Sequence, residues 1–426
     1  MSEEEEPTNS QTQQEENTSV NLTSTKVYKK SAQNNKIILY LGTRDIVVSD
    51  KSADKIQGVV YVDPDYLKDK KVYGQVTLTF RYGREDEEVM GLKFCNEAIM
   101  CLVQLHPPHE KLPKAPLTPL QEALLKRLGP NAHPFMMEVT PMAPPSVQLV
   151  PAKEYNGAPI GTSYDIRAFA ATRADEKLHR RNYVRMGIRV IQRAAMPPQS
   201  SNNNSSQVPQ SDVPAPHVVL NKPFLLSEGK VKLEASLDKA VYSHGDSIQV
   251  NVSITNETKK TVRRLKILVI QHVDVCMFSN GKFKNVVAMI DSKEDCPLRP
   301  GATLTKTFVL NPAKGVTKNW IALEDSYVRA PSSLAATVVC NSPDERNVFA
   351  IYVSYYVKIK TQVGALGSDV SVKLPFALTP SPADAELLDQ SPERYSPIQS
   401  TSADHVTPGT SFAQDMITVD TTQPER

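Results

Sequence analysis

Hydrophobic and polar residues alternate along many short stretches of this chain, which is the pattern of half-buried strands. The clearest stretch is Asn182–Gln192, whose apolar residues share one face and whose polar residues, Arg189 among them, share the other. A polar row of this kind usually faces water, so Arg189 could be an ordinary solvated arginine. Alternatively, it belongs to a buried ion-pair cluster between two domains. Such a cluster suits a switch, because removing one partner leaves a desolvated charge behind.

Two series of such stretches predict the fold. Gly, Pro, Asn and Asp punctuate both series, as in all-β sandwiches. We therefore predict an all-β protein of two tandem immunoglobulin-like β-sandwiches. The first series comprises a strand from Lys26, Lys36–Val48 with a break at Gly42, Gly58–Asp63, Val72–Arg81, Asn96–Leu105, Val147–Leu149, Tyr164–Ala171 and Asn182–Gln192. The second comprises Lys230–Leu237, Ser247–Thr255, Val262–Phe278, Thr303–Leu310, Ala335–Cys340, Val348–Val363 and Val370–Leu374.

One short amphipathic helix is predicted between these strands. Thr118 and Gln121 have the spacing of a capping box, Pro119 suits the first helical position, and Gly129 ends the pattern. Leucines recur every fourth residue and form one apolar stripe. We expect this stripe to lie against a sheet.

Composition divides the chain into five segments. Residues 1–25 hold six glutamates and no lysine or arginine, and 379–426 is again polar, so we predict disordered tails at both ends. A Pro/Ser/Asn-rich hinge linker is expected over 194–222. The two sandwiches then occupy 26–193 and 223–378.

Charge and cysteine content narrow the class of protein. The 426 residues include 49 basic and 47 acidic side chains, so no overall positive field favours nucleic acid. The five cysteines form no C-x-x-C pair, which fits reduced thiols in a reducing compartment. The acidic N-terminus does not resemble a signal peptide, and no apolar run is long enough to cross a membrane. These features predict a cytosolic protein.

The sequence carries none of the common catalytic or cofactor-binding motifs. The sequence has no G-x-S-x-G elbow, no phosphate-binding G-x-x-x-x-G-K-[ST] loop and no H-E-x-x-H pair. His106 and His109 flank two prolines with no acid or thiol at ligand spacing, so a surface loop explains them better than a metal site. We therefore expect a non-enzymatic binding protein without metal or cofactor.

Several stretches in both sandwiches together resemble the arrestin family, and the invertebrate receptor-binding branch in particular. The chain has no P-P-x-Y ligand of the kind carried by the trafficking branch. The similarity covers roughly residues 26–378. It is carried by VYKKSAQNNKIILYLGTRDIV (Val27–Val47), GVVYVDPDYLKDKKVYGQVTLTFRYGREDEEVMGLKF (Gly58–Phe94), LQEALLKRLGPNAHPF (Leu120–Phe135), YSHGDSIQVNVSITNETKKTVRRLKILV (Tyr242–Val269), IALED (Ile321–Asp325) and FAIYVSYYVKIKTQVGALG (Phe349–Gly367).

The resemblance implies a cytoplasmic protein that activated, phosphorylated seven-helix receptors recruit to the membrane. There it would exclude the G protein and end signalling, and rhodopsin is one candidate receptor. An alternative from the same fold is a signalling scaffold or endocytic adaptor with little part in shut-off. The resemblance leaves the receptor, and visual against non-visual use, open.

The resemblance also assigns a phosphate-sensing group. Lys29 and Lys30 match the lysines with which the family detects receptor phosphates, and Arg44, Lys126 and Arg127 match further basic positions. Together they would form a local anion site on a nearly neutral protein. Consecutive strand residues point to opposite faces, so a bend or a strand end would have to bring both lysines to one phosphate.

A polar core between the domains is implied as well. Arg189 matches the family's buried arginine, Asp45 its acid from the first domain, and Glu324 an acid from the second, with Asp325 beside it. Where the family commonly has one more acid, this chain has Pro331. The resting lock could therefore be weaker or built differently.

The family's own C-terminal tail docks on the first strand and the helix. Val27 and Tyr28 are expected to pack on Leu120, Leu124 and Leu128 at that place. The same apolar contact would exist in any sandwich with this helix, so the role of the tail is what the resemblance adds.

The charged stretch Tyr82–Phe94 matches the loop that enters the receptor's cytoplasmic cavity. A solvent-exposed hairpin tip would have the same composition. The residues assigned to this loop are Tyr82, Gly83, Arg84, Glu85, Asp86, Val89, Met90, Gly91 and Leu92.

Two further partners follow from the family. Lys266 and Lys284 match inositol-phosphate-binding positions, although exposed lysines are common on strands. Inositol phosphates or phosphoinositides are therefore candidate ligands. The tail argues against clathrin and its adaptors, because Phe412 stands alone and no clathrin box has the right spacing.

Overall fold

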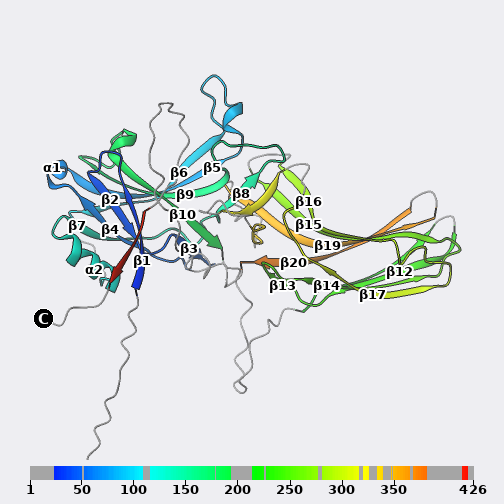
Figure 1. Cartoon of the computed structure of the whole chain (residues 1–426). Coiled ribbons are helices and arrows are strands. Elements are labelled where there is room, and N and C mark those ends of the chain that lie inside the picture. Colours follow the sequence, from blue (N-terminus) through cyan, green and yellow to red (C-terminus); the bar gives the residue numbers. More distant parts are fainter. Residues whose placement is uncertain are drawn as a thin grey trace, which may run out of the picture.

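Figure 1 shows an elongated molecule in which two β-domains lie end to end. The computed structural model describes residues 24–49, 52–108, 116–177, 179–192, 214–224, 227–276, 281–315, 320–325, 333–338, 347, 349–364, 368–380 and 415–420. Most of the segments predicted as tails (1–25 and 379–426) and linker (194–222) lies outside these residues, and their disorder stays a prediction.

The N-terminal domain consists of a five-stranded and a seven-stranded sheet. The strand order is β21-β1-β2-β4-β7 in the first sheet and β18-β8-β9-β10-β3 in the second, where β5 pairs with both β9 and β6. The strands are β1 (Ser24–Ser31), β2 (Ile37–Leu41), β3 (Asp45–Val48), β4 (Ile56–Val62), β5 (Lys71–Arg81), β6 (Cys95–His106), β7 (Ala132–Met137), β8 (Val147–Val150), β9 (Ile160–Ala171), β10 (Tyr183–Gln192), β18 (Ile321–Glu324) and β21 (Asp415–Asp420).

The C-terminal domain has a four-stranded sheet and a five-stranded sheet. The four-stranded sheet has the order β11-β12-β14-β17 and the five-stranded sheet the order β13-β20-β19-β15-β16. Their strands are β11 (His217–Phe224), β12 (Ser227–Leu237), β13 (Val241–Ser243), β14 (Ile248–Asn256), β15 (Val262–Val275), β16 (Lys282–Ser292), β17 (Thr303–Leu310), β19 (Ile351–Val363) and β20 (Ser368–Thr379).

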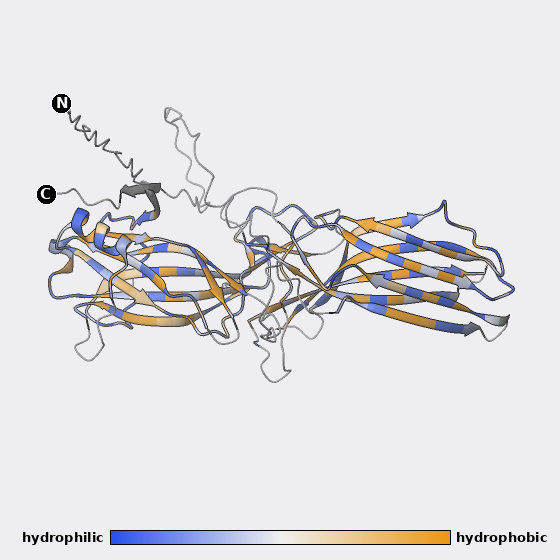
Figure 2. Cartoon of the chain, turned by 90° about the horizontal axis from the view of Figure 1, so that it is seen from below, coloured by the Kyte–Doolittle hydropathy of each residue, from blue (hydrophilic) through white to orange (hydrophobic). Residues whose placement is uncertain are grey.

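Alternation of apolar and polar residues accounts for both cores. In β19 every second residue from Ile351 to Val363 is buried, and β10 buries Val184, Met186, Ile188 and Val190 on one face. Figure 2 shows the resulting apolar and polar bands along the strands of both domains. The predicted all-β architecture is confirmed.

Helix α2 (Pro119–Leu128) has the predicted caps. The Gln121 N–H donates to the Thr118 hydroxyl at 3.2 Å, and the Thr118 N–H donates to the Gln121 side-chain oxygen at 3.0 Å. The Gln121 amide nitrogen also donates to the carbonyls of Gly58 and Phe135, at 3.0 and 2.9 Å. One residue therefore caps the helix and fastens it to β4 and β7.

Several elements differ from the sequence-based prediction. Ala335–Cys340 was expected to be a strand, but its described part makes only an isolated bridge, Val338 with Val353. Strand β11 starts at His217, inside the segment expected to be linker. Six strands were not predicted, namely β7, β11, β13, β16, β18 and β21, and the short helix α1 (Pro64–Leu67) was also missed. Strands β13 and β18 are only three and four residues long, which is too short for an alternating pattern to stand out.

The two domains share a hydrogen-bonded sheet. Strand β18 comes from the second half of the chain, yet it pairs antiparallel with β8, with Glu324 opposite Val147. Phe80, Val147 and Ile160 of the first half also join the large core of the second domain. The end of β18 is thereby brought to the end of β10, where the candidate site lies.

Candidate functional site

Arg189 and Asp45 form a bidentate ion pair at this junction. Strand β10 runs parallel to β3, and the register places Arg189 beside Asp45. The Nε and Nη2 atoms of Arg189 donate to the two carboxylate oxygens of Asp45 at 3.0 and 2.6 Å. The Arg189 side chain is only 12% exposed. It is therefore not the solvated arginine that the alternating pattern alone would favour.

Two acidic residues from the second half of the chain lie close to this ion pair. Arg189 Nη1 donates to the backbone carbonyl of Asp325 at 3.3 Å, and the Glu324 carboxylate accepts from the Ala336 N–H at 2.6 Å. Burial, with a smaller effect of the negative charge of Glu324, raises the pKa of Asp325 to about 6, and the positive charge of Arg189 opposes this rise. The four residues predicted for the polar core thus lie within electrostatic reach of one another.

Arg44 also belongs to this buried cluster. It is predicted to be one of the phosphate-sensing bases, but the residue is only 6% exposed. Its Nε donates to the carbonyl of Gly187 at 2.7 Å, and its positive charge helps to lower the pKa of Asp325. A Cβ at Gly187 would lie 3.4 Å from the Arg44 guanidinium, so the two residues are in close contact. Arg44 therefore lies beside the polar core, although it was predicted as a phosphate-sensing residue.

The predicted contact between the first strand and the helix is present in part. Val27 is fully buried and packs with Leu124, with Leu120 and Leu128 at the edge of the same cluster. Tyr28 instead packs on the main core, and the Arg44 guanidinium lies 5.6 Å from its ring centroid. Grouping Tyr28 with Val27 was wrong, because neighbouring strand residues point to opposite faces.

The C-terminal strand β21 completes this region. It pairs antiparallel with β1, with Ile417 opposite Val27 and Met416 opposite Tyr28, and it also contacts α2. Composition predicts a disordered tail, and a docked tail is implied only by the resemblance to the family. The pairing places a segment of the chain's own tail along the outer edge of β1.

The two lysines of β1 lie on opposite faces of the strand. Pairing with β2 is regular from Tyr28 to Ser31 and has no bulge, so the bend that would bring Lys29 and Lys30 together is absent from this strand. Lys29 lies opposite Tyr40, whose pKa is raised by burial and lowered by the nearby charge of Arg127. Lys29 and Arg127 thus flank the same tyrosine. Lys30 lies on the same face of β1 as Tyr28, whose ring contacts the Arg44 guanidinium.

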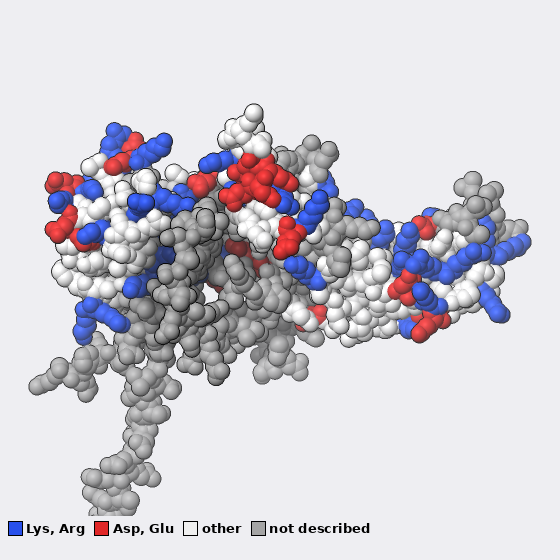
Figure 3. All heavy atoms as spheres, turned by 45° about the horizontal axis from the view of Figure 1, so that its top comes forward, with Lys and Arg blue, Asp and Glu red and all other residues white. Residues whose placement is uncertain are grey.

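The loop between β5 and β6 projects from the N-terminal domain (Figure 1). Its tip is apolar and exposed, with Val89 62%, Met90 101% and Leu92 66% accessible. The backbone turns there through positive φ at Met90 and Gly91. Figure 3 shows acidic side chains gathered on this loop beneath an uncharged tip, and the sequence Glu85–Glu88 supplies them.

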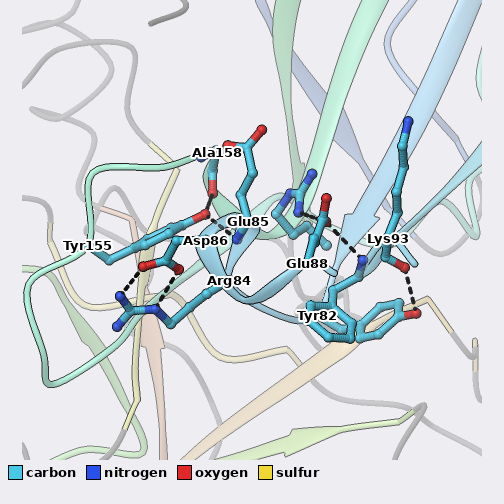
Figure 4. Close-up of polar contacts among 10 residues, drawn as sticks. Tyr82, Arg84, Glu85, Asp86, Glu88, Lys93, Tyr155 and Ala158 are labelled. Atoms are coloured by element: carbon cyan, nitrogen blue, oxygen red, sulfur yellow. Dashed lines mark hydrogen bonds and ion pairs between the residues drawn. The ribbon is translucent and has the colours of Figure 1, made fainter. Parts of the chain in front are cut away.

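Hydrogen bonds fix the base of this loop (Figure 4). Glu88 accepts from Arg81 at 2.6 Å and from the Phe94 N–H at 2.9 Å, and the Tyr82 hydroxyl donates to the Lys93 carbonyl at 3.3 Å. A second contact, with Tyr155 and Ala158 of another loop, was not predicted. The only sequence signal there was the Asn156-Gly157 turn pair, which says nothing about a distant partner.

The lysines assigned to inositol phosphates lie on the outer face of the five-stranded sheet of the C-terminal domain. Lys266 contacts Asp291 at 3.6 Å and lies opposite Lys360 of β19. Lys284 lies opposite His272, whose pKa is lowered first by burial and then by the positive charge of Lys284. The lysines make the face locally positive, but Asp291 and Asp369, which pair with Lys266 and Lys360, compensate part of this charge.

Within the described residues, neither a metal site nor a membrane-spanning helix is found. No three histidine, cysteine or acidic side chains in these ranges are placed to hold a metal ion. In the same part of the chain, no helix has the length and apolarity needed to cross a bilayer.

Comparison with protein families gives two matches that together cover most of the chain. Residues 37–195 match the family model of the arrestin (or S-antigen) N-terminal domain, and residues 227–383 match that of the C-terminal domain. These boundaries enclose most strands of the two sandwiches, and β1, β11 and β21 lie outside them.

Individual relatives match over both domains. An arrestin homolog of Heliothis virescens is 40% identical over 355 residues, or 83% of this chain and 89% of that protein. The lateral eye arrestin of Limulus polyphemus is 39% identical over 359 residues, 84% of this chain and 85% of its own length. Beta-arrestin-2 of Bos taurus is 40% identical over 363 residues, 84% of this chain and 82% of its own.

Proposed function

The chain belongs to the arrestin family, and on this basis we propose that it binds activated, phosphorylated G protein-coupled receptors and blocks their coupling to G proteins. Arrestins are non-enzymatic regulators that desensitise receptors. The protein would act in the cytoplasm and be recruited to the membrane by the receptor. One relative is named for an eye, so a light-activated receptor such as rhodopsin is the first partner to test.

The observation that carries the proposal is the buried pair of Arg189 with Asp45, closed by the carbonyl of Asp325. One member comes from the second half of the chain, so the cluster holds the two domains in one arrangement. Breaking a buried pair by removing one partner costs about 3–5 kcal/mol, because a desolvated charge is left without compensation. That is enough to favour a resting state, and several charge-assisted bonds to phosphate can overcome it.

The position of the basic residues supports phosphate as the trigger. Lys29 and Lys30 lie on β1, the strand that pairs with the tail strand β21. Tyr28 lies between Val27, which faces α2, and the lysines, and its ring is 5.6 Å from the Arg44 guanidinium. Phosphates that draw on these lysines would disturb β1. The disturbance reaches the tail through Val27 and the polar core through Tyr28.

Binding to receptor membranes tests the proposal. We expect the protein to sediment with activated, phosphorylated receptor and much less with activated, unphosphorylated receptor. Excess G protein should displace it, because both occupy the same cytoplasmic cavity. If excess G protein does not displace the protein from the receptor, shut-off by competition is refuted and the scaffold or adaptor role is favoured instead.

Polyanion binding to the second domain is part of the same proposal. Lys266 lies opposite Lys360 on one face of the five-stranded sheet of this domain, and burial followed by the positive charge of Lys284 lowers the pKa of His272 on the same face. Lys284 lies opposite His272, further along β15 than Lys266, so the two lysines offer separate contacts for the phosphates of an inositol phosphate or phosphoinositide headgroup.

A further inference from the structure

Strand β18 is bonded to both domains at once. It pairs with β8 of the N-terminal domain, and this pairing places Ala322 opposite Leu149. The Ala322 N–H, however, donates to the side-chain oxygen of Gln271 at 3.0 Å, and the Gln271 amide nitrogen donates back to the Ala322 carbonyl at 2.8 Å. A side chain from β15 of the C-terminal domain thus bonds to both backbone groups of one residue, as a paired strand would.

Two more side chains complete the bonding of Gln271. Its amide nitrogen also donates to the Tyr355 hydroxyl at 2.8 Å, and this hydroxyl donates to the Ala335 carbonyl at 2.6 Å. The Asn285 amide nitrogen donates to the Gln271 oxygen at 3.4 Å and to the Trp320 carbonyl at 2.6 Å. Gln271 therefore uses both of its donors and both of its acceptor positions. We call Gln271, Asn285 and Tyr355 the strand clamp.

The strand clamp lies in the interior of the protein. Gln271 is 0% exposed, Tyr355 2% and Asn285 5%. Burial raises the pKa of the Tyr355 hydroxyl, so this group stays protonated and remains a donor. A buried amide loses its hydration, and the loss is offset only while every one of its hydrogen bonds is made. Movement of β18 away from Gln271 would break several of these bonds together, so the clamp holds the strand in one register.

The clamped residue lies three positions before Asp325 of the polar core. Strand residues rise about 3.3 Å each, so Ala322 lies within about 10 Å of Asp325. Arg189 donates to the backbone carbonyl of Asp325 at 3.3 Å, and this bond depends on where β18 ends. The strand is only four residues long, so pairing with β8 alone offers few bonds to resist local opening.

We propose that Gln271 is a positioning residue for the polar core, because it ties β18 to the C-terminal domain in the register that presents Asp325 to Arg189. This role rests on the proposed function, since it concerns the same resting state. When the strand clamp is weakened, β18 opens more readily and Arg189 loses the carbonyl that it binds. The resting state then becomes less stable, and receptor binding needs less phosphate.

Two substitutions test the strand clamp. Tyr355→Phe removes one hydroxyl and keeps the ring, whereas Gln271→Met keeps a side chain of similar length without its hydrogen bonds. Tyr242→Phe is a matched control, because Tyr242 is also a buried tyrosine of the C-terminal domain, and its hydroxyl donates at 2.6 Å to Asp238 instead of to this network. Hydrogen exchange of the intact protein reports the clamp without any receptor. The peptide that contains Ile321–Glu324 should exchange roughly three- to tenfold faster in both test variants and at the parent rate in Tyr242→Phe.

Receptor sedimentation then tests whether the strand clamp acts through the polar core. Both test variants should bind activated, unphosphorylated receptor roughly three- to tenfold more tightly than the parent protein, while Tyr242→Phe should not. Adding Tyr355→Phe to Arg189→Glu should give no further gain, because the clamp positions a contact that Arg189→Glu already lacks.

Each outcome decides one step. Unchanged exchange of β18 in Tyr355→Phe refutes the strand clamp, whether or not Gln271→Met folds. Faster exchange with unchanged or weaker receptor binding refutes its control of the resting state, and a further gain on top of Arg189→Glu refutes action through the polar core. A parent protein that binds no activated, phosphorylated receptor refutes the proposed function instead, whatever the exchange experiment shows.

Discussion

Reversing the charge of Arg189 is the strongest test of the polar core. In Arg189→Glu two carboxylates face each other where the structure has bonds of 3.0 and 2.6 Å, and the carbonyl of Asp325 loses its donor. Both ion-pair partners are largely buried, with Asp45 27% exposed, so the lower end of the range for buried pairs applies, about 3 kcal/mol. This energy corresponds to a shift on the order of 100-fold between resting and released states.

The assay is sedimentation with activated receptor that carries no phosphate. We expect Arg189→Glu to bind it with most of the affinity that the parent protein shows for phosphorylated receptor. Arg173→Glu is the control, because Arg173 belongs to the same domain but is 76% exposed and pairs only at the surface with Asp175. Such surface pairs contribute little to stability, so its phosphate dependence should not change.

A charge swap distinguishes the pair from a general disturbance. Asp45→Arg combined with Arg189→Glu restores opposite charges on β3 and β10 at the same register. We expect the double variant to regain phosphate dependence, because the coupling between directly paired residues is recovered. The reasoning is wrong if Arg189→Glu still requires phosphate, or if the double variant behaves like the single one.

Four further predictions concern other parts of the molecule. The half-buried Asp325 has a pKa raised to about 6 from its ordinary value of 3.8. Its ionised form therefore opposes folding at pH 7, and the folded protein binds a proton at higher pH than the unfolded chain does. Asp325→Asn should therefore be more thermally stable than the parent protein at pH 7, and this difference should shrink as pH falls towards 5. Leu124 is 1% exposed, so Leu124→Ala should lower the free energy of unfolding in urea by about 2–5 kcal/mol. Deleting residues 415–426 removes β21, so the β1 amides that pair with it should exchange faster and receptor binding should depend less on phosphate. Lys284→Gln should weaken the binding of inositol hexakisphosphate in titration calorimetry. Unchanged affinity would exclude this lysine from the site.

The sequence was sufficient for features that depend on local pattern. Alternation in β10 predicted which of its residues are buried, and the spacing of Thr118 and Gln121 predicted the helix cap. Alternation could not decide whether Arg189 faces water or a partner, since this depends on the parallel pairing of β10 with β3 across 144 residues. The resemblance to a family resolved that choice.

Other features have no local signature. The contact of Tyr155 with Glu85 joins two loops without periodicity, and only their position in the folded domain brings them together. The grouping of Tyr28 with Val27 failed for a different reason. Both residues belong to β1, but neighbours on a strand point to opposite faces, so only Val27 can face α2.

The pairing of β18 with β8 has a consequence for how the two sandwiches can turn against each other. A connection made by a flexible tether would allow free swivelling, but a ladder of backbone bonds from Ile321 to Glu324 resists shear and yields mainly to torsion about its own axis. Reorientation of the domains must then twist this short ribbon. Heating should give one shared endotherm in calorimetry, since neither half can melt without tearing a strand from the sheet of the other.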